Sequence, residues 1–174
     1  RALLYVYFKD KSDLVFALAD RALAALQGRF SDCAKSQATG LDQIREMGRA
    51  YLSFSQECPT LFEALARFEL HSPAVEHATG AEAACVQSGD SVHQVMIAAI
   101  DAGVRDGSIR ADVGPPMLVS ITLWGFMHGV IQLAATKTNV LAHDGVAAQS
   151  LFEQALAMAT RSLVAPEKNE SNNE

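Results

Sequence analysis

The chain has 174 residues, of which 49% are hydrophobic, and this is enough to bury one substantial core. Its net charge of -6 argues against a segment that wraps nucleic acid by itself, because such domains carry a basic surface. The three cysteines are odd in number and lack metal or redox spacing, so we expect reduced thiols in a cytoplasmic protein. Abundant alanine and the lack of period-two alternation predict an all-α fold.

In the first half of the chain, the predicted helix ends are marked by capping residues. Asp10 is a candidate N-cap for a helix over residues 10–30, and the polar stretch 31–40 is expected to form a loop. Thr39 and Asp42 make a capping-box-like start for the next helix. That helix ends at a Cys-Pro pair, because the residue before a proline is pushed out of helical geometry, and the proline opens a further helix.

The second half of the chain predicts three longer helices. The first ends at Gly107, which supplies a C-terminal stop. Residues 117–135 follow a Gly-Pro-Pro signal and are apolar around nearly the whole circumference of the predicted helix. Such a helix must be covered on every side. The last helix is expected over about 144–164.

The apolar run 117–135 is also long enough to be read as a membrane span. Polar side chains interrupt it at Ser120, Thr122, His128 and Gln132, and no basic flank anchors an orientation. The helices on both sides are amphipathic. We therefore predict a core helix and no membrane association.

Lys11 is an unusual residue for the first turn of a helix. A cation there opposes the helix dipole, so stability does not explain it. An anion such as DNA phosphate, held jointly by the helix N-terminus and the ammonium group, would explain it, and a merely solvated lysine is the alternative.

The segment around Lys11 resembles the signature that closes the helix-turn-helix of tetracycline-repressor (TetR) type transcriptional regulators. The residues that match in order and spacing are Tyr5, Tyr7, Phe8, Lys11 and Leu14. The resemblance implies that Tyr5 and Lys11 contact operator phosphates and that Tyr7 lies near the DNA backbone. It also implies that residues 1–9 are the end of a DNA-binding head of which most is missing here.

Motifs further along the chain extend the resemblance. The run Leu123-Trp124-Gly125-Phe126-Met127-His128-Gly129 resembles the subclass of TetR C-terminal domains named for tryptophan, histidine and glycine. The resemblance implies that residues 10–30 form a connecting helix and that residues 31–165 form the ligand-binding and dimerisation domain. The polar residues 166–174 are expected to be a disordered tail.

Large aromatic and methionine side chains at helical spacing are either core residues or the lining of a cavity. The resemblance implies an effector cavity, and the scarcity of inward-facing charge favours a largely apolar small molecule. The candidate ligand-binding residues are Phe54, Phe62, Phe68, Met96, Trp124, Met127 and His128. His128 could instead be a core histidine whose nitrogens are bonded within the protein.

The helices over 117–135 and 144–164 carry more apolar surface than one small domain needs. A two-fold four-helix bundle built from both helices of each copy would bury that surface, and the resemblance implies the same homodimer. Two glycines in the first helix allow close helix contact. The candidate interface residues are Gly125, Gly129, Leu151, Ala155 and Met158.

The sequence holds no catalytic arrangement that we can identify. It lacks a Gly-x-Ser-x-Gly elbow, a Gly-rich phosphate loop and a Glu-x-x-His pair, and its five histidines are scattered, so we expect no enzyme, metal or cofactor. The predicted function is a homodimeric, ligand-responsive repressor that binds operator DNA through its N-terminal head. A dimerisation scaffold without an effector, or a helical enzyme using His128 with a distant carboxylate, are the alternatives.

Overall fold

The computed structural model describes residues 8–68, 76 and 78–165, and this part of the chain is built from helices alone, apart from one isolated β-bridge. The all-α prediction is confirmed. The expected tail, 166–174, lies outside the described residues. The helices are α2 (Lys11–Ser36), α3 (Gly40–Glu57), α4 (Pro59–Phe68), α5 (Ala81–Asp106), α6 (Pro116–Thr136), α7 (Thr138–His143) and α8 (Ala148–Leu163).

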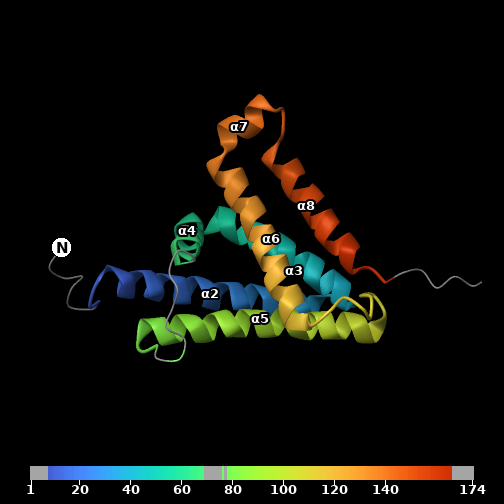
Figure 1. The fold of residues 1–174 in the computed structure, drawn as a ribbon, viewed down its shortest axis with the longest axis horizontal. Helices are drawn as coiled ribbons and strands as arrows, with labels where there is room; N and C mark the ends of the chain where they lie inside the picture. The colour runs from blue at the N-terminus through green and yellow to red at the C-terminus, as the bar shows by residue number, and fades with distance from the viewer. Residues whose placement is uncertain (1–7, 69–75, 77, 166–174) are drawn as a thin grey trace, which may run out of the picture.

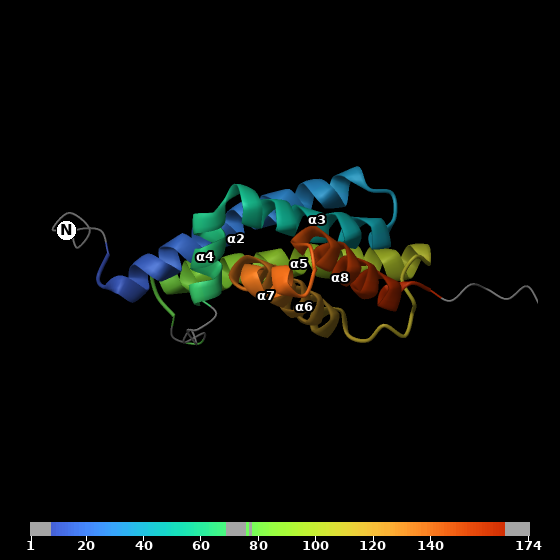
Figure 2. The same ribbon diagram turned by 90° about the horizontal axis from the view of Figure 1, so that it is seen from above.

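The two longest helices, α2 and α5, lie side by side along the long axis of the molecule (Figure 1). Helix α6 crosses them, α7 forms the far turn, and α8 returns toward the body. From above, α2 and α3 lie on one side, α6 and α7 on the other, and α8 lies between α3 and α6 (Figure 2). A single hydrophobic core joins α2, α3, α4, α5, α6 and α8, whereas α7 contributes no buried residue.

Helix α2 begins where the sequence predicts and ends later. The side chain of Asp10 accepts a hydrogen bond of 2.9 Å from the backbone N–H of Asp13, which confirms the N-cap. The predicted loop over 31–40 is wrong in its first part, because the helix continues to Ser36. Cys33 and Ala34 pack against the core and keep this polar stretch helical.

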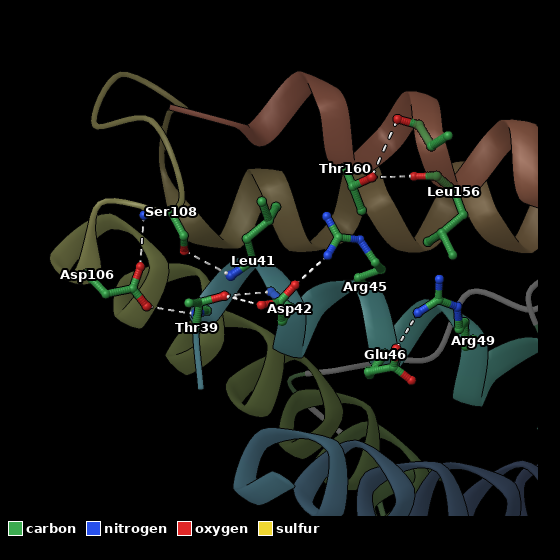
Figure 3. A network of polar contacts seen from close by, with 12 residues as sticks. Thr39, Leu41, Asp42, Arg45, Glu46, Arg49, Asp106, Ser108, Leu156 and Thr160 are labelled. Atoms are coloured by element: carbon green, nitrogen blue, oxygen red, sulfur yellow. Dashed lines mark hydrogen bonds and ion pairs between the residues drawn. The ribbon is translucent and has the colours of Figure 1, made fainter. Parts of the chain in front are cut away.

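The start of α3 is capped both locally and by the end of α5, as Figure 3 shows. Thr39 Oγ1 accepts from the backbone N–H of Asp42 at 3.2 Å, which confirms the predicted cap. The carboxylate of Asp106 accepts from the backbone N–H of Gly40 at 2.8 Å, and Ser108 Oγ accepts from that of Leu41 at 3.1 Å. The two helix ends are therefore fixed to each other.

The predicted terminal signals at the next boundaries are also confirmed. Cys58 is the C-cap of α3, and Pro59 is the first residue of α4. Gly107 ends α5 with φ +79°, in the left-handed region that favours glycine.

The predicted start of the last helix needs correction. Helix α8 starts at Ala148 instead of Asp144, because Gly145 turns the chain with φ +67°, and the short helix α7 before it was not predicted. Within one chain α6 keeps an uncovered face, since Leu118 is 61% and Phe126 40% exposed, so the remaining cover predicted for this helix would have to come from a second copy.

In the described part of the chain, α6 is the one helix long and apolar enough to cross a membrane, judged by length and composition alone. Its buried face carries Ser120 and His128, and both make hydrogen bonds to side chains of other helices. A core helix with one uncovered face explains the composition.

Candidate effector cavity

An apolar cavity of about 240 Å³ lies at the centre of the helical body. Side chains from six helices line it, and nearly all of them are aliphatic, aromatic or methionine. Helix α2 contributes Leu23, Leu26 and Phe30. The long helix α2 is therefore a wall of the cavity along part of its length.

Four of the seven candidate ligand-binding residues line this cavity, namely Phe68, Met96, Trp124 and Met127. The other three lie outside it. Phe54 is fully buried, and the guanidinium of Arg29 lies 5.5 Å from its ring centroid. Phe62 stacks on His128 with centroids 5.2 Å apart.

His128 is bonded within the protein, behind the cavity wall. Its Nδ1 lies 2.6 Å from the hydroxyl oxygen of Tyr51, and its Nε2 lies 3.3 Å from Nε2 of Gln132. Tyr51 itself lines the cavity. The structure thus gives His128 the contacts of a buried core histidine, and His128 is not among the residues that line the cavity.

Besides Tyr51 and Thr160, the polar side chains of the cavity wall come from α5, and the sequence analysis did not select them. His93 and Asp90 both line the cavity. His93 Nδ1 lies 2.8 Å from Ser120 Oγ, and the Ser120 hydroxyl lies 3.6 Å from the sulfur of Met96. The ring of His93 also makes an edge contact with Trp124, at 5.7 Å between centroids.

Burial lowers the pKa of His93 below its ordinary value of 6.5, and the charge of Asp90 opposes that shift in part. The lowered pKa favours the neutral imidazole. The one sequence signal for His93 was its position three residues before Met96, on neighbouring faces of the same helix.

The candidate DNA-binding residues lie at the other end of α2. Lys11 is exposed in the first turn of that helix, while Tyr5 and Tyr7 lie outside the described residues. Within residues 8–68, 76 and 78–165, no group of three His, Cys, Asp or Glu side chains could hold a metal ion.

The candidate dimer residues divide between the surface and the core. Gly125 and Gly129 are exposed, and a Cβ added to either would meet nothing within 4 Å. Met158 is 53% exposed and Leu151 is half-buried, whereas Ala155 is buried inside its own subunit. All exposed large hydrophobic residues of the described chain lie between residues 117 and 164.

The described helices enclose an apolar cavity and leave large hydrophobic side chains of α6 and α8 uncovered. An apolar cavity of this kind is typical of a small-molecule-binding domain. The sequence comparison specifies the family. Residues 44–159 match the family described as "Tetracyclin repressor-like, C-terminal domain", and the chain belongs to this family. The predicted TetR family is confirmed, whereas the tryptophan-histidine-glycine subclass and the missing part of the DNA-binding head stay predictions.

Solved structures show the same fold. A protein of unknown function from Rhodococcus sp. RHA1 is 20% identical, with a TM-score of 0.69 over 91% of this chain and 77% of that chain. The reduced form of NemR from E. coli is 18% identical, with a TM-score of 0.58 over 97% of this chain and 82% of that one. No curated protein sequence matches the chain.

Proposed function

We propose that the chain is the body of a ligand-responsive transcription repressor whose effector is a small, largely apolar molecule. The cavity of about 240 Å³ carries this proposal, because it is lined by apolar side chains and includes a wall of α2. An engineered apolar cavity of about 150 Å³ is large enough to bind benzene. The effector is therefore expected to be a compound with one or two rings, or of similar volume.

The geometry of α2 supports conformational coupling between the cavity and the DNA-binding end of the helix. Leu23, Leu26 and Phe30 contact the cavity, and Lys11 stands in the first turn of the same continuous helix. Lys11 and Leu23 lie twelve positions apart, which is about 18 Å along the helix axis at a rise of about 1.5 Å per residue. A ligand that binds more tightly to one orientation of α2 would favour that orientation and so shift the position of the DNA-binding head. The affinities for operator and effector would then depend on each other reciprocally.

The uncovered face of α6 and α8 supports a homodimer. Leu118, Phe126 and Met158 are exposed there, and the open glycines Gly125 and Gly129 would let a second helix approach closely. A four-helix bundle from two copies would cover this face. Leu118→Glu is expected to convert the dimer to a monomer in native mass spectrometry, whereas Gln94→Glu, on an exposed position of α5, should leave it dimeric.

A cavity-filling pair of variants tests the effector site. Ala159 lines the cavity, and Ala157 on the same helix does not. In a thermal-shift screen of small apolar compounds, we expect Ala159→Leu to lose the stabilisation that the native protein and Ala157→Leu both show. Circular dichroism checks that both variants are folded.

Two results would refute the proposal in different ways. A dimer that no small molecule stabilises would favour the scaffold without an effector. Equal operator affinity with and without a bound compound, measured on a form that carries a complete DNA-binding head, would refute the coupling through α2.

A further inference from the structure

We propose that His93 anchors the effector by a hydrogen bond from its Nε2 edge, so that the effector is an uncharged ring compound carrying a hydroxyl group, such as an alkylphenol. This inference rests on the proposed effector cavity and adds the chemical class of its ligand. His93 is then a specificity-determining residue of the cavity, and the apolar wall binds the ring.

The first observation is that the two nitrogens of His93 face different surroundings. Nδ1 is bonded to Ser120, which is fully buried and also contacts the sulfur of Met96. No hydrogen bond to Nε2 is present among the described residues, and no buried side-chain nitrogen or oxygen there lacks a partner. Nε2 is therefore accessible, on a side chain that lines the cavity.

The second observation is that the ring of His93 is held in place. Ser120 fixes one edge at 2.8 Å, and Trp124 contacts the ring at an interplanar angle of 84°. A hydrogen-bonding group that is fixed before the ligand arrives loses little entropy on binding. A ligand that forms a hydrogen bond with Nε2 of His93 should thus bind more tightly than a hydrocarbon of equal size.

The cavity lining disfavours acids. The side chains that form it include no Lys or Arg, and the pKa of His93 is lowered, which favours the uncharged imidazole. A carboxylate ligand would therefore lose its hydration without gaining a positively charged partner. A hydroxyl group fits either tautomer of His93, because it both donates and accepts.

The charge of Asp90 also raises the question of an amine ligand. Asp90 is exposed to solvent, so an ion pair with an ammonium group would be screened by water and weak. The buried polar contacts of His93 favour the hydroxyl compound, and an amine is included in the test as a competitor.

The experiment compares four ligands of one shape on the chain as it stands: 4-ethylphenol, ethylbenzene, 4-ethylbenzoate and 4-ethylbenzylamine. Dissociation constants are measured by isothermal titration calorimetry at pH 7.5. We expect 4-ethylphenol to bind at least about fivefold more tightly than ethylbenzene, the value of one net hydrogen bond, and the two charged compounds to bind more weakly than either.

The matched variants are His93→Phe and His143→Phe, the latter on the exposed helix α7 outside the cavity. His93→Phe should bind ethylbenzene as well as the native protein does and lose the preference for 4-ethylphenol. His143→Phe should keep it. If His93→Phe does not fold, His93→Leu serves in its place. The ratio of the dissociation constants of ethylbenzene and 4-ethylphenol in the native protein remains a test by itself.

The outcomes separate this inference from the proposed function. Equal binding of 4-ethylphenol and ethylbenzene, or a preference that persists in His93→Phe, overturns the role of His93 and leaves the effector cavity standing. Tightest binding of the benzoate or the amine also overturns it. If none of the four compounds binds, the inference fails, and the thermal-shift screen with Ala159→Leu and Ala157→Leu decides separately whether the effector cavity stands.

Discussion

Replacing Gly40 by alanine should destabilise the protein strongly, because the first residue of α3 crosses the backbone of α5 in direct contact. A Cβ at Gly40 would lie 2.1 Å from the backbone nitrogen of Gly103 and 2.3 Å from the carbonyl oxygen of Ala99. Ordinary contact to a Cβ begins at 3.4 Å, so the two helices would have to separate by about 1 Å. Neither obstacle is a flexible side chain that could move aside.

The cost follows from what this separation breaks. Overpacking a core typically costs about 1–3 kcal/mol. Here the shift would also loosen the hydrogen bonds from Gly40 and Leu41 to Asp106 and Ser108. We expect a loss of at least about 3 kcal/mol, or a fall in Tm of roughly 6–12 °C for a domain of this size.

Gly28 provides the matched control. It is exposed within α2, and a Cβ there would meet nothing within 4 Å. Gly28→Ala should therefore raise stability by about 0.5–1 kcal/mol through helix propensity. Both variants are measured by urea unfolding and by thermal circular dichroism at one protein concentration. A Gly40→Ala protein as stable as the native one would refute the close crossing of α3 and α5.

Three further predictions concern single side chains. Asp106→Ala should cost about 1 kcal/mol in urea unfolding because it removes a cap of α3, whereas Asp101→Ala, at an exposed position of α5, should be neutral. Burial raises the pKa of the Cys85 thiol to about 12, so a thiol reagent at pH 8 should modify Cys85 only after unfolding, and its modification in the native protein would contradict this. The pKa of His93 is lowered in the folded protein, so below a pH of about 6.5 the unfolded chain binds more protons than the folded one, and the free energy of unfolding should decrease. This decrease with falling pH should be less steep in His93→Phe. Equal slopes in the two proteins would refute the lowered pKa of His93.

The helix boundaries could be predicted where the signal is local. Asp10, Thr39, Pro59 and Gly107 each act on a neighbouring backbone group, and the structure confirms all four. The end of α2 could not be predicted in this way. Cys33 and Ala34 pack against the hydrophobic core, and tertiary packing of this kind can override the polar composition around them.

The candidate site could likewise be predicted only where neighbouring residues in the sequence carry the signal. Apolar periodicity selects Met96, Trp124 and Met127, which line the cavity, but it equally selects Phe54, which lies outside it. The partner of His128 is Tyr51, 77 positions earlier in the chain, and no local pattern joins them. His93 becomes notable only when Ser120 is seen beside it.

The cavity wall draws on residues from Leu23 to Thr160, so it is complete only when nearly the whole described chain has folded. Any molecule that occupies it therefore stabilises the entire fold, by about 2.7 kcal/mol at a free concentration one hundred times its dissociation constant. Proteases act mainly on the unfolded fraction of a protein. If the proposed effector occupies the cavity in the cell, the lifetime of the protein would rise with the concentration of that effector, and its abundance would respond even without a change in DNA binding.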